Sequence, residues 1–177
     1  VEPELQPEHI EWVGEADTAF VGGAVAWAVG AVHRYYRGDV DAPMAVPVRQ
    51  QGTEFVEAAW RAMRHIPPGQ PYTYAELAAA AGRPAAARAA GTACSHNATA
   101  LFVPCHRVVP SGRGIGNFGW GAPVKQALLA REAAAREAAA AAALRAAAEA
   151  ATAAAEAARA AAADPAATAD LAAAGQS

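Results

Sequence analysis

The residues best suited to chemistry are a cysteine and a histidine side by side, Cys105 and His106, in the segment VPCHRVVP. A thiol acts as a nucleophile in its thiolate form, and a nearby imidazole or positive charge favours that form. Adjacent residues of an extended chain point to opposite sides, so contact between these two side chains needs a sharp bend or a bridging water. From the residues alone two interpretations stay open: an activated nucleophile, or a small buried hydrophobic residue that happens to precede a histidine.

Cysteine usage and hydropathy limit the class of protein. The chain has 177 residues and two cysteines, which build no disulfide framework. No Cys/His spacing resembles a zinc site, so we expect no metal, no cofactor and a reducing compartment, the cytoplasm. The apolar segment 19–32 is shorter than the roughly 20 residues that span a bilayer. It predicts a buried helix and no contact with a membrane.

Charge is distributed unevenly along the chain, whose formal net charge is −3. Between Tyr72 and Lys125 the only acid is Glu76. The basic residues of this stretch are Arg83, Arg88, Arg107, Arg113 and Lys125. A local basic surface can bind a polyanion even in an acidic protein, although a solvated basic face fits the charge equally well.

Two helices are expected before residue 70. The first covers about 18–37, with Thr18 able to cap its start and Gly38 able to end it. The second lies in GTEFVEAAWRAMRHIPPGQ, where apolar side chains recur at steps of three and four residues. Pro67 and Pro68 stop this helix, and its aromatic residues are expected in the core.

The segment from Tyr72 to Asn97 predicts two short helices joined by a tight turn. Thr73 and Glu76 have the spacing of a capping box, Gly82 can end the first helix, and Pro84 fits the first turn of the second. Such a pair is a helix-turn-helix or an ordinary helical hairpin. Arg88, a long cation among alanines, favours the first.

The strings PCHRVV (104–109), GNFGWG (116–121) and KQALLARE (125–132), preceded by GTEFVEAAWRAMRHIPPGQPYTYAELA (52–78), resemble the O6-alkylguanine-DNA alkyltransferases. The motifs match in order without visible gaps. GWG and TACSHN are most similar to the methyltransferase domain of the Ada-type proteins.

The resemblance implies a catalytic set. In that family a cysteine attacks the alkyl carbon on guanine O6, and a histidine held by a glutamate takes the thiol proton through a water. These roles fall on Cys105, His106 and Glu132, and the water removes the geometric obstacle of adjacency. The resemblance also implies that the Tyr74 hydroxyl meets the negative charge that develops on the guanine.

The resemblance further implies that the second helix enters the minor groove, where Arg88 fills the place of a flipped nucleotide. The DNA-binding residues it implies are Thr73, Arg88, Ala89 and Asn97. Asn97 also ties this helix to the cysteine loop. The substrate-pocket residues it implies are Val108, through its carbonyl, Phe118, Gly119 and Lys125. Phe118 stands where many relatives have tyrosine, Trp120 replaces a small residue, and Cys94 is not expected to be a nucleophile.

The fold class expected is α+β. A mainly helical winged helix-turn-helix domain at 49–133 follows a shortened α/β N-terminal domain at 1–48 and precedes an alanine-rich tail at 134–177, helical or disordered. The function implied is DNA repair by one irreversible transfer of an alkyl group to Cys105 from O6-alkylguanine, with O4-alkylthymine as a second substrate. The partner implied is double-stranded DNA containing O6-alkylguanine, bound by a monomer at the nucleoid.

Two alternative functions fit part of the sequence. A non-catalytic protein could bind alkylated DNA and recruit other repair factors, but such proteins carry tryptophan at the cysteine position, so Cys105 favours the transferase. A cysteine hydrolase using the Cys-His pair would turn over and would not depend on DNA.

Overall fold

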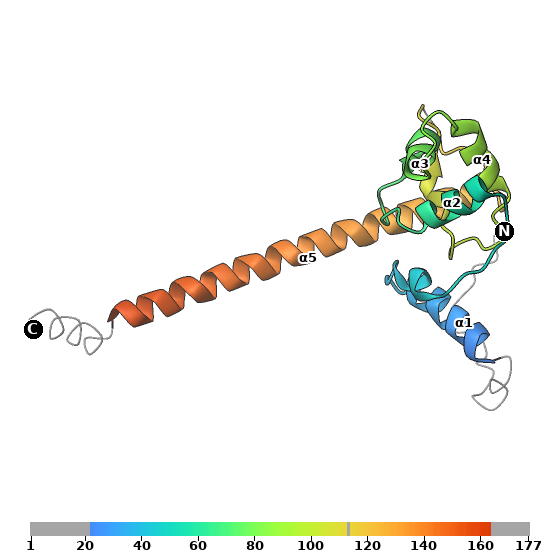
Figure 1. Cartoon of the computed structure of the whole chain (residues 1–177). Helices are drawn as coiled ribbons and strands as arrows, with labels where there is room; N and C mark the ends of the chain where they lie inside the picture. Colours follow the sequence, from blue (N-terminus) through green and yellow to red (C-terminus); the bar gives the residue numbers. More distant parts are fainter. Residues whose placement is uncertain (1–21, 113, 164–177) are drawn as a thin grey trace, which may run out of the picture. The chain divides into compact units, whose positions relative to one another are not determined.

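The computed structural model describes residues 22–112 and 114–163. It is a mixed, mainly helical structure with a small sheet (Figure 1). Its elements in chain order are α1 (Gly22–Tyr36), η3 (Ala42–Ala45), α2 (Glu54–Met63), β1 (Tyr72–Thr73), α3 (Tyr74–Ala80), α4 (Ala87–Ser95), η4 (Cys105–Arg107), β2 (Val108–Val109) and α5 (Ala122–Ala163). The chain divides into two units, with the boundary in the sequence between Arg136 and Glu137.

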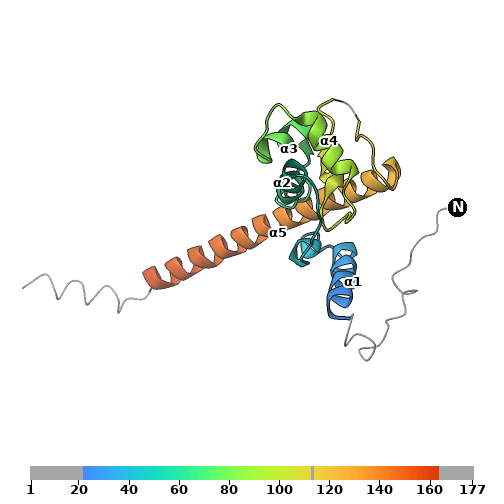
Figure 2. The ribbon, with the colours of Figure 1, turned by 45° about the vertical axis from the view of Figure 1, so that its right-hand side comes forward.

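The amphipathic helix expected after residue 52 is α2, and it lies at the centre of the main core. Its buried face consists of Phe55, Ala59, Trp60 and Met63. Helix α2 lies beside α3 and α4 in both views (Figures 1 and 2), and its buried residues Ala59, Trp60 and Met63 pack in one core with residues of these two helices. The indole N–H of Trp60 donates to the carbonyl of Ala93 at 2.8 Å, which satisfies the polar atom of a buried aromatic side chain. The prediction that the aromatic residue belongs to the core is confirmed.

Local signals fix both ends of α3. Thr73 accepts from the backbone of Glu76 while the Glu76 carboxylate accepts from the backbone of Thr73, so the predicted capping box is present. At the other end Gly82 has φ +84°, a conformation that favours glycine. Its N–H donates to Ala79, and the next N–H, from Arg83, donates to Ala78. This pair of bonds closes the helix as a Schellman motif.

The start of the following helix differs from the expectation. Pro84 lies in a turn, and α4 begins three residues later, at Ala87. The N–H of Ala86 donates to the carbonyl of Arg83, so residues 83–86 form a separate turn. The sequence pattern predicts instead that Pro84 lies in the first turn of the helix. Proline fits this turn as well as a helix start, because its fixed φ suits both.

The sheet consists of β1 and β2, two short strands that pair in parallel with Tyr72 opposite Val108 and Thr73 opposite Val109. Strand β1 runs directly into α3, while β2 directly follows η4. The pairing therefore holds the start of α3 beside the loop that carries Cys105.

Helix α1 covers most of the predicted segment 18–37, and Thr18 lies outside the described residues. The expectation of a buried helix is wrong, because Val25, Trp27 and Val29 are each more than 40% exposed. Only one side of the helix, at Ala31 and Tyr35, is buried. Composition alone does not separate a fully buried helix from one that is buried on a single side. When apolar residues occur all round a helix, their pattern does not indicate which face is covered.

Helix α5 begins with a buried face and continues as an exposed alanine-rich rod. Its buried side chains Lys125, Leu128 and Glu132 follow one another at steps of three and four residues. The predicted boundary at 134 lies inside this continuous helix, and the helical form expected for the alanine-rich part is present as far as Ala163. None of the described helices is both long and apolar enough to cross a membrane.

Candidate functional site

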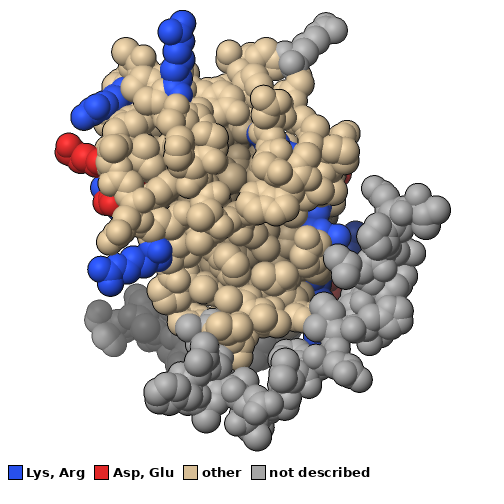
Figure 3. Space-filling view, turned by 90° about the vertical axis from the view of Figure 1, so that its right-hand side faces the viewer, with Lys and Arg blue, Asp and Glu red and all other residues tan. Residues whose placement is uncertain are grey.

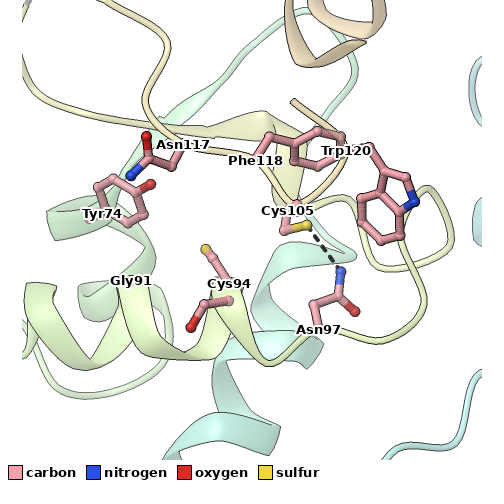
Figure 4. Close-up of a pocket in the computed structure, with 10 residues that line it drawn as sticks. Tyr74, Gly91, Cys94, Asn97, Cys105, Asn117, Phe118 and Trp120 are labelled. Atoms are coloured by element: carbon pink, nitrogen blue, oxygen red, sulfur yellow. Dashed lines mark hydrogen bonds between the residues drawn. The ribbon is translucent and has the colours of Figure 1, made fainter. Parts of the chain in front are cut away.

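Cys105 begins η4 and lies almost entirely within the protein, with 6% of its surface exposed. The side-chain amide of Asn97 holds it from the end of α4. Asn97 Nδ2 donates to Cys105 Sγ at 3.1 Å (Figure 4). It also donates to the carbonyl of Val103 at 2.6 Å. The thiol is thus placed by an N–H group that would also stabilise a negative charge on sulfur.

Burial raises the pKa of the Cys105 thiol, and the Asn97 hydrogen bond and the positive charge of Lys125 offset only part of this effect. The thiol is therefore protonated at neutral pH and needs a base before it can act as a nucleophile.

His106, the next residue, is fully buried, and its Nε2 lies 2.8 Å from Oε1 of Glu132. A carboxylate only accepts hydrogen bonds, so Nε2 carries the proton of this contact. Nδ1 of His106 is buried and has no hydrogen-bond partner among the described residues. The ring is thus oriented by the carboxylate on one side and offers a basic nitrogen on the other.

Glu132 is held by three side chains. Arg107 donates through Nε to Oε2 and through Nη2 to Oε1, both at 2.9 Å. The hydroxyl of Tyr35 donates to Oε1 at 3.1 Å. Burial alone would raise the pKa of Glu132, but the hydrogen bonds and the electrostatic attraction of His106 and Arg107 outweigh it and lower the pKa to about 2. The carboxylate is ionised at neutral pH.

Lys125 supports the same region from the first turns of α5. Its ammonium donates to the carbonyl of Val108 at 2.6 Å and lies 3.5 Å from the carbonyl of Asn117. Burial lowers the pKa of Lys125, while the nearby thiols of Cys94 and Cys105 act in the opposite direction. A cation held here favours the thiolate form of Cys105.

A cavity of about 500 Å³ opens in front of the thiol. Its lining residues are Tyr74, Gly91, Cys94, Ser95, Asn97, Cys105, Asn117, Phe118, Gly119 and Trp120. In Figure 4 the sulfur atoms of Cys94 and Cys105 face the cavity from opposite segments, with Tyr74 at one side and Trp120 at the other. The volume and the mixture of aromatic and polar groups suit a flat heteroaromatic ligand.

Two aromatic residues and a tyrosine hydroxyl shape this cavity. The ring centroid of Phe118 lies 5.3 Å from that of Trp120 and 6.5 Å from that of His106. Burial raises the pKa of Tyr74, so its hydroxyl keeps its proton at neutral pH and can donate a hydrogen bond. Gly116 brings the loop close to this hydroxyl, because a Cβ there would lie 3.4 Å from Tyr74 Oη and 2.9 Å from Pro110.

Comparison with known proteins assigns the chain to a family. A model described as "6-O-methylguanine DNA methyltransferase, DNA binding domain" matches residues 54–134. The methylated-DNA--protein-cysteine methyltransferase of Mycobacterium bovis is 33% identical over 138 residues, which are 78% of this chain and 79% of the relative. This chain belongs to the methylated-DNA--protein-cysteine methyltransferase family.

The matched segment spans only part of several other relatives. The bifunctional transcriptional activator/DNA repair enzyme Ada of Escherichia coli is 41% identical over 97 residues, and the match spans 55% of this chain and 27% of Ada. The crystal structure of Mycobacterium tuberculosis OGT in complex with DNA has a TM-score of 0.58 and 36% identity, covering 62% of this chain and 68% of that one. The match to the methyltransferase of Haemophilus influenzae spans 57% of that relative.

The structure brings together many of the residues that sequence analysis singled out for this methyltransferase family member. Tyr74, Asn97, Cys105, Phe118 and Gly119 line the cavity. Behind the cavity lie His106 and Glu132, and Lys125 is bonded to the carbonyl of Val108.

Three other predicted residues lie on α3 and α4 outside the cavity lining. Thr73 caps α3, Arg88 is exposed on α4, and Ala89 is partly buried on the same helix. Their predicted contacts are with DNA, so they remain predictions.

The basic surface predicted between Tyr72 and Lys125 is smaller than expected. Arg107 and Lys125 are each 1% exposed and serve the internal network, so they do not contribute to a surface. Arg83 and Arg88 are exposed, while Arg113 lies outside the described residues. On the face shown in Figure 3 most atoms belong to uncharged residues, and Lys and Arg side chains stand at its edges. A count of charges along the sequence cannot tell a buried cation from an exposed one.

Several residues of the site were not found from the sequence. Arg107 lies inside the PCHRVV motif, where its position beside His106 was a usable signal for a partner of Glu132. Tyr35 lies 97 residues before Glu132, and nothing in its local sequence indicates that contact. Asn117 lines the cavity as part of GNFGWG, but its role there was not anticipated.

Proposed function

We propose that this protein repairs DNA by transferring a methyl or small alkyl group from O6 of guanine, and from O4 of thymine, to Sγ of Cys105. One observation carries this proposal: a buried thiol faces a cavity, and the adjacent His106 has one ring nitrogen bonded to Glu132 and the other without a partner among the residues that the structure describes. The methyltransferase names of the relatives support it.

In the first step His106 acts as the base. One water molecule bridges Cys105 Sγ and His106 Nδ1, takes the thiol proton and passes one of its own to Nδ1. Glu132 stabilises the imidazolium that results, because its ionised carboxylate lies 2.8 Å from Nε2. The Asn97 N–H and the Lys125 ammonium stabilise the thiolate.

In the second step the thiolate attacks the alkyl carbon in a direct displacement. A carbon–sulfur bond forms, the bond between carbon and O6 breaks, and its electron pair stays on the guanine. The Tyr74 hydroxyl, which lines the cavity, donates a proton or a hydrogen bond to the purine as negative charge develops. The backbone carbonyl of Val108 accepts a hydrogen bond from the guanine amino group. The same oxygen also accepts from the Lys125 ammonium. The thioether has no route back to thiolate, so each molecule reacts once.

DNA binding is assigned to α3 and α4. We propose that these helices form the helix-turn-helix of a winged domain at residues 49–133, after a shortened N-terminal domain at 1–48 and before a tail at 134–177. Arg88 is exposed on α4 and takes the place of the flipped nucleotide. Thr73, Ala89 and Asn97 are the other residues that we propose for DNA binding. The partner is duplex DNA containing O6-alkylguanine, bound by a monomer in the cytoplasm at the nucleoid.

The chain's two cysteines give a matched test of the transfer. After incubation with a duplex that contains O6-methylguanine, intact mass should rise by one methyl group in the wild type and in Cys94→Ala. The mass should not change in Cys105→Ala. Peptide mapping by mass spectrometry locates the added group. Binding of the duplex with no gain of mass in the wild type would instead support a recruiting protein without transferase activity.

Replacing Arg88 tests the proposed extrusion of the nucleotide. Arg88→Ala should slow transfer from the duplex by about tenfold, equivalent to about 1.4 kcal/mol, because the vacated stack is no longer filled. Transfer from free O6-benzylguanine should keep its wild-type rate, since a free base requires no extrusion. Arg145→Ala, an exposed arginine of α5, serves as the control. Equal losses with both substrates would contradict the proposed role of Arg88.

A further inference from the structure

Gln50 contacts the residue that holds the reactive thiol, although it lies before the segment that matches the family model, residues 54–134. Its Nε2 donates to Oδ1 of Asn97 at 3.1 Å. Its Oε1 accepts the backbone N–H of Ala98 at 2.9 Å. Gln50 thus reaches across from the chain preceding α2 and binds the turn that follows α4.

Groups of fixed polarity decide how the Gln50 amide is turned. A side-chain amide has one accepting end and one donating end. The N–H of Ala98 can only donate, so it must meet the oxygen of Gln50. The nitrogen of Gln50 then faces the oxygen of Asn97.

The same argument fixes the second amide. Oδ1 of Asn97 accepts from Gln50 and also from the backbone N–H of Thr99 at 3.2 Å. Nδ2 is therefore left to face the carbonyl of Val103 and the sulfur of Cys105. The Gln50 amide, the Thr99 N–H and the Val103 carbonyl thus all favour the orientation of Asn97 that sets an N–H group against the sulfur atom.

We propose that Gln50 is a positioning residue, which orients the Asn97 amide so that an N–H group, rather than an oxygen, faces Sγ of Cys105. Gln50 does not line the thiol cavity and acts on the sulfur through Asn97. Its importance for repair rests on the proposed function, in which that sulfur accepts the alkyl group. Its effect on the thiol itself does not depend on that function.

The other titratable groups around the sulfur come from different elements. Lys125 belongs to α5, Tyr74 to α3 and Cys94 to α4, and each interacts electrostatically with Cys105. His106 follows in the chain. The hydrogen bonds of Gln50 go instead to Asn97 and Ala98. A change confined to Gln50 leaves these groups in place.

The sharpest variant is Gln50→Glu. A carboxylate still accepts from Ala98, but it sets an oxygen against Oδ1 of Asn97. This repulsion works against the orientation that Thr99 and Val103 favour and weakens the contact of the Asn97 N–H with the thiol. The pH profile of Cys105 alkylation by iodoacetamide should shift about one unit upward, with a rate near neutral pH about tenfold lower. Peptide mass mapping separates Cys105 from Cys94. Gln50→Leu, which removes both bonds without adding charge, should shift the profile less in the same direction.

Gln51→Glu is the matched control, because Gln51 is the exposed neighbour and receives the same charge. Its profile should remain that of the wild type. A double-mutant cycle gives the second control: in an Asn97→Ala background, Gln50→Glu should have no further effect on Cys105.

Three results would overturn the proposal: a wild-type profile in Gln50→Glu, an equal shift in Gln51→Glu, or a full shift that persists without Asn97. Methyl transfer from DNA is measured on the same samples. If the profile shifts as expected and the wild type still accepts no methyl group, the positioning role stands and the transferase function fails. If the wild type accepts a methyl group but the profile of Gln50→Glu does not shift, the transferase function stands and the positioning role of Gln50 fails.

Discussion

At the scale of single residues, Glu132 joins three side chains of the site. One buried carboxylate accepts from Tyr35, His106 and Arg107. This arrangement does two things, since it orients the imidazole next to the thiol and neutralises a guanidinium that is itself 1% exposed. Breaking such a buried pair by removing one charge costs about 3–5 kcal/mol, because the remaining charge stays buried and unpaired.

The pH dependence of stability provides a test of this residue. The pKa of Glu132 falls from 4.5 to about 2 on folding, so its contribution is complete above pH 4.5 and is lost as the pH falls towards 2. A shift of this size corresponds to about 3 kcal/mol. In Glu132→Gln the free energy of unfolding should therefore be lower at neutral pH and should fall by about 3 kcal/mol less on acidification than in the wild type.

Urea unfolding at a series of pH values measures this difference. Glu149→Gln, at an exposed position of α5, should keep the wild-type dependence. A Glu132→Gln variant whose stability falls with acid as steeply as that of the wild type would show that this carboxylate is not the group responsible.

At the scale of elements, the site depends on helices that are distant in sequence. α1 contributes Tyr35, α4 ends next to Asn97, and α5 contributes Lys125 and Glu132 on one face. Tyr35 is fully buried, whereas its neighbour Tyr36 is 52% exposed with its ring under the guanidinium of Arg131. Of these adjacent tyrosines, Tyr35 supports the site through Glu132, whereas Tyr36 packs at the surface against Arg131.

Removing one hydroxyl at a time tests the contribution of α1. Tyr35→Phe should lower the free energy of unfolding by about 1.5–3 kcal/mol, the usual range for a hydrogen bond to a charged group. Tyr36→Phe keeps the ring that lies against Arg131 and should change stability very little. Thermal and urea unfolding of the two variants give the comparison, and equal effects would mean that the Tyr35 bond does not support Glu132.

At the scale of the whole molecule, the site is wider than the segment that matches the family model. The family model matches residues 54–134, yet Tyr35 and Gln50, which lie before it, hold Glu132 and Asn97. Arg64, at the end of α2, also links the residues before the matched segment to those within it. Its guanidinium donates to the carbonyls of Met44 and Val46 and to that of Phe102. The second unit, from Glu137 onward, is an exposed alanine-rich helix in its described part.

The sequence alone was sufficient for the features that depend on local chemistry. The capping box at Thr73 and Glu76, the glycine end of α3, the buried stripe of α2 and the helical alanine-rich segment all follow from residue types at short spacing, and the structure confirms them. The motifs around Cys105 were likewise enough to indicate the family.

Tertiary structure decided what depends on contacts between distant segments. Only folding shows that Arg107 and Lys125 are internal cations and that α1 leaves Trp27 exposed. Only folding brings Tyr35 to Glu132 across 97 residues, and Gln50 to Asn97 across 47. Burial and hydrogen-bond partners are properties of the packed chain, and no pattern of neighbouring residues encodes them when the partners come from other elements.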